Sequence, residues 1–131
     1  MDLYSGELNL VFAWVWVCVG ILYGAALGSR FHEEGWMDGY GSFRRRLYRL
    51  AHVAIFALAM LNLLFHFTAR SLEGASVAVP IASLAFVIGA VFMPVCCLLV
   101  AHRPKLRMAF AVPITSLLLA SVLTAWQVIA R

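Results

Sequence analysis

The sequence predicts an all-α integral membrane protein, a four-helix transmembrane bundle that forms a single membrane domain over residues 1–131. Composition is the first reason: 64% of the residues are hydrophobic and only 12% are charged, against roughly 25% charged in an average soluble domain. The second reason is that the charges are segregated. A helix needs about 20 apolar residues to cross a ~30 Å hydrocarbon core, and four uncharged runs each reach this length. None alternates in polarity over about 10 residues, as a membrane strand would.

The predicted helices cover residues 8–29, 48–69, 75–101 and 108–130. The residues before the first helix are acidic and lack the basic region of a secretory signal peptide, so we expect this helix to be retained. It carries Gly20, Gly24 and Gly28 at four-residue steps, a spacing that lets helix backbones approach closely in lipid. The third and fourth helices carry similar stripes of small residues, and Pro94 should kink the third.

The cations predict the orientation. Residues 30–49 and 102–107 hold eight of the ten Lys and Arg residues. Because cytoplasmic loops carry an excess of Lys and Arg, segments 30–47 and 102–107 should be cytoplasmic and both termini outside (N-out/C-out). We expect a bacterial inner membrane, with anionic lipid contacting Arg44, Arg45, Arg46 and Arg49. The basic runs lack interleaved aromatics, so no nucleic acid is expected as a partner.

The second helix carries the polar stripe on which a functional hypothesis can be built. His52 and His66 are fourteen residues apart, which places them within about 40° of each other and roughly 21 Å apart along the helix. Asn62 lies one turn before His66, and the small Ala59 falls midway. Polar side chains within a bilayer usually face the interior of a bundle. The same stripe also fits interfacial histidines that bond neighbouring helices or headgroups and are not deeply buried.

The H-x13-H spacing resembles that of the di-haem cytochromes b, in which two such histidines bind haems in opposite leaflets. The resemblance covers one helix and implies haem b near the inner surface, with His52 and either His102 or His32 as iron ligands. A second haem at His66 would need a ligand from another subunit or a five-coordinate iron.

Two further sites are consistent with the sequence. A quinone could bind at His52, Tyr48 and Phe56, with Arg49 nearby. Zinc or non-haem iron could bind in the inner segment, whose candidate ligands are His32, Glu33, Glu34 and Asp38, together with His52 and His102. The alternative for these acidic residues is charge balance with the Arg44–Arg46 run.

These features favour a small subunit or anchor of a membrane redox complex, with other membrane subunits as partners and an electron-transfer role through haem b or quinone. The alternative is a non-catalytic structural or assembly subunit without a cofactor. A metal-dependent membrane enzyme is third, and catalysis by this chain alone is not the favoured interpretation.

Overall fold

The computed structural model describes residues 6–72 and 76–130, which contain helices, turns and loops but no strand. The long helices are α1 (Glu7–Gly28), α2 (Phe43–Ser71), α3 (Ala78–His102) and α4 (Ala111–Ile129), and two short 3₁₀ helices are η1 (Trp36–Asp38) and η2 (Pro104–Phe110). Four helical segments are long and apolar enough to cross a membrane, η2 and α4 forming the fourth together. The all-helical expectation and its four apolar segments are confirmed for the described chain.

The largest difference from the predicted bounds is at the start of α2, five residues before residue 48. Ser42 precedes the helix, and its Oγ accepts a hydrogen bond of 3.1 Å from the Arg45 backbone N–H. A side-chain oxygen at this position satisfies one of the free N–H groups of a helix start. The helix can therefore begin within the arginine run, ahead of the apolar residues that predicted it.

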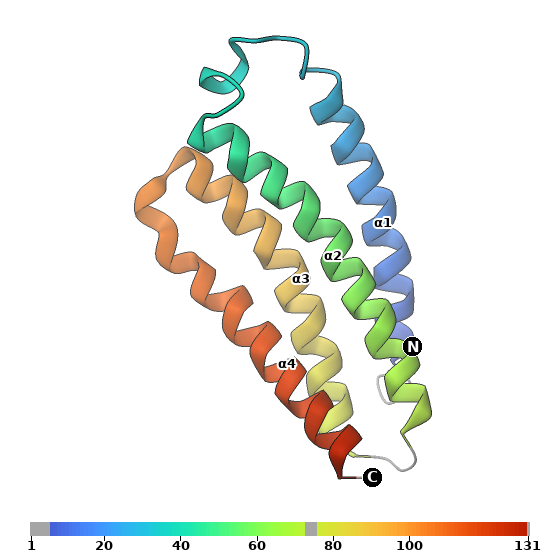
Figure 1. The fold of residues 1–131 in the computed structure, drawn as a ribbon. Helices are drawn as coiled ribbons and strands as arrows, with labels where there is room; N and C mark the ends of the chain where they lie inside the picture. The colour runs from blue at the N-terminus through green and yellow to red at the C-terminus, as the bar shows by residue number, and fades with distance from the viewer. Residues whose placement is uncertain (1–5, 73–75, 131) are drawn as a thin grey trace.

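The four helices lie side by side in chain order, with α2 and α3 in the middle (Figure 1). The extensive pairings are α1 with α2, α2 with α3, and α3 with α4. The two central helices are consequently the most buried, whereas α1 and α4 leave most of their apolar surface exposed. Lipid or other membrane subunits must cover these outer faces if the chain spans a bilayer.

The arrangement separates the molecule into two chemically different ends. The loop with η1 and the turn with η2 lie together at one end, and the start of α1 and the end of α4 lie at the other (Figure 1). We call the first the basic end, residues 29–49 and 102–110, and the second the terminal end. The two predicted basic segments thus share one end. Which side of a membrane it faces remains a prediction.

Two of the three predicted packing glycines lie against α2. A Cβ added at Gly20 would lie 2.8 Å from the Phe56 ring, and one at Gly24 would lie 2.5 Å from Nε2 of His52. Gly28 differs, because an added Cβ would meet nothing within 4 Å. Gly28 therefore packs against no other helix of the described chain, although Leu27 beside it is buried.

The α3–α4 contact is equally close. A Cβ added at Gly89 would lie 2.5 Å from Cγ of Leu117, and the small residues Ala82, Ala85 and Ala120 are buried in the same apolar cluster. Close backbone approach is the main source of helix association where lipid is as apolar as the side chains. This seam attaches α4, whose main helical partner is α3.

Gly89→Ala should destabilise the protein, because the new methyl group would overlap Leu117. Overpacking of this kind costs about 1–3 kcal/mol. Gly28→Ala is the matched control and should leave stability unchanged or slightly higher, since its site is open. Thermal unfolding in detergent, followed by circular dichroism, measures both; equal melting temperatures would contradict the described α3–α4 seam.

Candidate functional site

The polar stripe of α2 faces into the protein. Asn62 is fully buried and His66 is 2% exposed, while His52 is half-buried. All three side chains meet α1 or the residue that precedes it. The expectation of an inward-facing stripe is met, and the neighbouring helix that covers it is α1.

Asn62 belongs to a buried hydrogen-bond network that links three helices. The Asn9 amide nitrogen donates to Asn62 Oδ1 at 2.8 Å and to the Ser83 carbonyl at 3.1 Å. The Ser83 hydroxyl donates to Asn9 Oδ1, and the Asn62 amide donates to the Leu58 carbonyl at 2.8 Å. Asn9, Asn62 and Ser83 are each fully buried. The network ties α1, α2 and α3 together towards the terminal end.

Sequence analysis did not single out Asn9 or Ser83. The sequence signal for Asn9 was its side-chain amide near the start of an uncharged run, because an amide inside hydrocarbon needs a hydrogen-bond partner. The spacing along one helix could not identify that partner, which lies on another helix 53 residues away.

His66 is more deeply buried than an interfacial histidine. Its Nδ1 lies 3.0 Å from the backbone oxygen of Gly6. Since a carbonyl only accepts, Nδ1 must carry the ring proton and donate. Gly6 has a φ of 68° and packs directly against His66, where even a Cβ would lie 3.1 Å from the His66 Cα. The residue that caps α1 therefore covers His66.

His52 lies between α1 and α2 at the basic half of the molecule. Its ring stacks on Tyr23 with centroids 5.9 Å apart and meets the edge of Phe56 at 5.3 Å. Nε2 points at Gly24, where the lack of a side chain makes room for the ring. An iron bound to Nε2 would therefore require α1 to move away from α2.

His102 ends α3 and forms hydrogen bonds with two residues of α2. Its Nδ1 lies 3.2 Å from Nη2 of Arg44, and its Nε2 lies 2.8 Å from the hydroxyl of Tyr48. A guanidinium can only donate, so Nδ1 accepts from Arg44 and Nε2 carries the proton that is donated to Tyr48. The hydroxyl proton of Tyr48 is then free to be donated to a third group.

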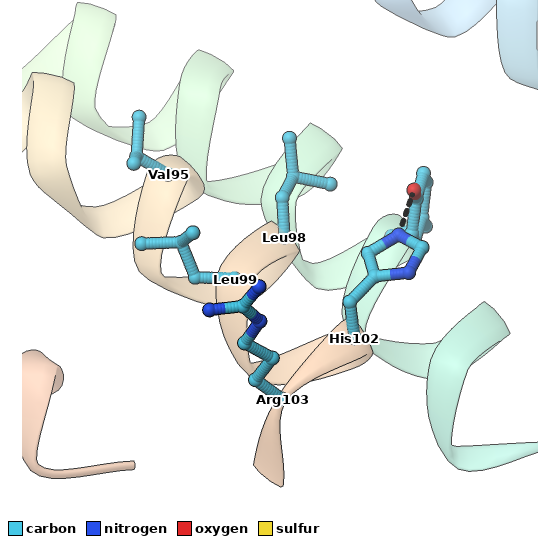
Figure 2. A pocket seen from close by; sticks show the side chains of 6 residues that line it. Val95, Leu98, Leu99, His102 and Arg103 are labelled. Carbon is cyan, nitrogen blue, oxygen red and sulfur yellow. Dashed lines mark hydrogen bonds between the residues drawn. The ribbon is translucent and has the colours of Figure 1, made fainter. Parts of the chain in front are cut away.

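Beside the hydrogen-bonded residues Arg44, His102 and Tyr48 lies an apolar pocket of about 320 Å³. Val95, Leu98 and Leu99 of α3 form its walls, and His102, Arg103 and Tyr48 border it at the basic end (Figure 2). The dashed line in Figure 2 is the bond between His102 and the Tyr48 hydroxyl. The pocket thus combines apolar walls with one available hydroxyl donor. Tyr48 was a predicted site residue, but the histidine beside it is His102, whereas His52 faces α1.

The predicted metal cluster of the inner segment does not form. Among the residues that the structure describes, no group of three or more His, Cys, Asp or Glu side chains could hold a metal ion. His32 is exposed in the loop. Glu33 pairs with Arg30 at 3.4 Å, and Asp38 lies 3.9 Å from Arg44. These contacts match the charge-balance alternative.

No protein-family model, no curated protein and no solved structure matches this chain. Functional inference therefore depends on the geometry of the site alone.

Three of the four predicted lipid-contacting arginines have partners within the protein. Arg45 is only 2% exposed, donates to the Phe31 carbonyl at 3.1 Å, and has the rings of Phe31, Trp36 and Tyr40 within 5.1–5.3 Å of its guanidinium carbon. This burial leaves Arg45 no surface for a lipid phosphate, contrary to expectation. Instead it holds the loop that contains η1.

The other arginines near Arg45 have different surroundings, because successive helical residues point about 100° apart. Arg44 bonds His102, and Arg49 lies 4.3 Å from the centre of the Tyr40 ring. Arg46 alone of these four arginines is exposed. The arginine run is therefore mainly a structural element of the basic end.

A double-mutant cycle tests the buried network. Asn9→Ala and Asn62→Ala should each destabilise the protein, and their coupling should be about 0.6–1.7 kcal/mol, the average to maximum for hydrogen bonds between membrane helices. Asn9→Ala with Thr115→Ala is the control pair, because Thr115 bonds only its own helix, through the Ala111 and Val112 carbonyls. Unfolding in mixed micelles measures all variants, and additive Asn9 and Asn62 effects would refute the direct bond.

Arg45→Ala should loosen the loop over residues 30–42, because it removes a buried hydrogen bond and three ring contacts. We expect a loss of about 1–3 kcal/mol and faster cleavage of this loop by protease. Arg46→Ala removes the same charge from an exposed position and should cleave at the native rate. Identical cleavage of the two variants would be the contrary result.

Proposed function

We propose that the protein is a small membrane subunit of a redox complex and that it binds the ring of a quinone in the pocket beside Tyr48. The observation that supports this is the position of the Tyr48 hydroxyl at the edge of an apolar pocket of about 320 Å³, 2.8 Å from Nε2 of His102. Because Arg44 lies at Nδ1 of the same ring, we infer that the hydroxyl accepts from His102 and keeps its own proton for a ligand. Tyr48 was part of the quinone site expected from the sequence and is retained here, whereas His102 takes the place of His52.

The pocket has the chemistry that a quinone requires. A quinone ring is flat and largely apolar, and its carbonyl oxygens accept hydrogen bonds. Leu98 and Leu99 offer an apolar surface to the ring, and the Tyr48 hydroxyl can donate to one oxygen. A few placed polar groups within an otherwise apolar pocket typically fix the orientation of a small ligand. Because Val95 and Leu99 are exposed, an isoprenoid tail can leave the pocket directly into surrounding lipid.

Arg44 and His102 position the donor. Arg44 donates to Nδ1 of His102 and thereby sets its tautomer. Nε2 of His102 then donates to the hydroxyl oxygen of Tyr48, whose own proton is not used in this bond. Partners arranged behind a contacting group commonly orient it and tune its strength. In this account Tyr48 contacts the ligand, and the other two residues are positioning residues.

The four apolar helices supply the anchor of such a subunit. The basic end would lie in the cytoplasm of a bacterium, with the pocket in the inner leaflet of the cytoplasmic membrane. The exposed faces of α1 and α4 are available to the catalytic subunits that would exchange electrons with the quinone.

Haem b is the second candidate, and at His66 it would require the neighbouring chain to move aside, because this side chain is 2% exposed. The Nδ1 of His66 donates to a backbone carbonyl, which orients the ring and, in the neutral tautomer, leaves Nε2 as the nitrogen that could ligate iron. His52 is covered by Gly24 in this structure. A haem at His66 would take its second axial ligand from another subunit or leave the iron five-coordinate.

Tyr48→Phe should weaken binding of a short-chain ubiquinone or menaquinone analogue by about 3–10-fold, because one hydrogen bond of roughly 0.5–1.5 kcal/mol is lost. Tyr40→Phe is the matched control: it removes the same hydroxyl at the basic end but keeps the ring that packs on Arg45 and Arg49. Its affinity should stay within twofold of the native value. Titration calorimetry in detergent measures each constant.

Saturable native binding that both variants leave unchanged would remove Tyr48 from the site. An absence of binding by the folded native protein would favour the structural subunit that lacks a cofactor.

A visible spectrum separates the haem candidate. If haem b is bound at His66, protein purified from haem-replete cells should show a Soret band and a reduced α-band that His66→Ala abolishes and His52→Ala retains. Colourless protein from such cells would contradict this candidate and leave the quinone proposal intact.

A further inference from the structure

The cations of the η2 turn have no acidic partner within the described residues. Arg103, Lys105 and Arg107 are all exposed, and the ion pairs among the described residues of the basic end are Arg30 with Glu33 and Arg44 with Asp38. Two of the three acidic residues at the basic end are thus already paired. The η2 cations therefore form a positive surface that the protein itself does not neutralise.

Apolar side chains alternate with these cations. Leu106 is 41% exposed and Met108 is 76% exposed, although both directly adjoin charged residues. Lys105 and Arg107, with Pro104, line a hollow of about 390 Å³ between them. A surface that combines exposed apolar side chains with Lys and Arg is typical of segments that lie in the headgroup region of a membrane.

The arginine run on α2 provides the contrast. Arg45 is buried and Arg44 is held by His102 and Asp38, so neither is free to bind an external phosphate. The η2 turn offers the same type of charge without acidic partners among the described residues, and it lies at the start of the fourth segment that is apolar enough to cross a membrane. The position and the composition of the surface both point to a lipid as its partner.

We propose that the hollow lined by Lys105 and Arg107 binds the phosphate of an anionic phospholipid, while Leu106 and Met108 insert among the acyl chains. The cations attract the anionic headgroup of a lipid at a charged membrane surface. The apolar pair distinguishes a lipid from free phosphate, because a dissolved anion gains nothing from Leu106 or Met108. This site is separate from the Tyr48 pocket and does not depend on a quinone.

Native mass spectrometry of the detergent-solubilised chain, titrated with phosphatidylglycerol or phosphatidylcholine, tests the proposal. We expect phosphatidylglycerol to bind at least fivefold more tightly than phosphatidylcholine, and Lys105→Gln/Arg107→Gln to abolish most of that preference. Arg30→Gln/Arg46→Gln is the control, because it removes two exposed cations from the same end but outside the hollow. It should change the preference by less than twofold.

Two additional measurements distinguish a lipid phosphate from free inorganic phosphate. Leu106→Ser/Met108→Ser should weaken phosphatidylglycerol binding while the cations remain, and millimolar inorganic phosphate should not displace the lipid. Circular dichroism confirms that each variant is folded. Equal losses in the two charge variants would indicate diffuse attraction and overturn the site. Displacement by inorganic phosphate, or no effect of the apolar variant, would overturn the assignment to lipid.

Discussion

A polar side chain that is buried among apolar helices has no water to bond, and this constraint determines how α1 is held. Asn9 must find partners within the protein, and it finds them on α2 and α3, where Asn62 and Ser83 need partners for the same reason. The network fixes the rotation and depth of α1. Gly6 consequently reaches His66, and Gly24 comes to lie over His52. The environment of both α2 histidines thus follows from one buried set of hydrogen bonds.

The basic end is organised by charge and aromatic contact. Arg45 gathers three rings of the loop around its guanidinium, and Arg44 bridges from α2 to His102 at the end of α3. The polar groups that reach the apolar pocket are Tyr48, His102 and Arg103, and the first two are hydrogen-bonded to each other. The pocket thus arises at the end opposite the buried network, where α3 terminates against the start of α2.

The sequence predicted the helices well because each apolar run has to be long enough to cross a membrane, and length is visible along the chain. It also predicted that Asn62 and its neighbouring histidines would face inward. It could not predict which helix covers them, since Asn9 and Ser83 are identified only by contacts across the bundle. Arg45 shows the same limit: the sequence gives three adjacent cations, and only the packed loop distinguishes the buried one from the exposed Arg46. His102 was named as a haem ligand, but its bonds to Arg44 and Tyr48 are tertiary contacts.

Photoaffinity labelling would locate the proposed quinone site on the protein. The native protein in lipid nanodiscs would be irradiated with an azidoquinone, digested, and mapped by mass spectrometry, with excess unlabelled quinone as competitor. We expect competed labelling to be concentrated on residues 95–103 of the α3 end and on the α2 segment that contains Tyr48. Competed labelling on the outer faces of α1 or α4, with none on these two segments, would contradict it.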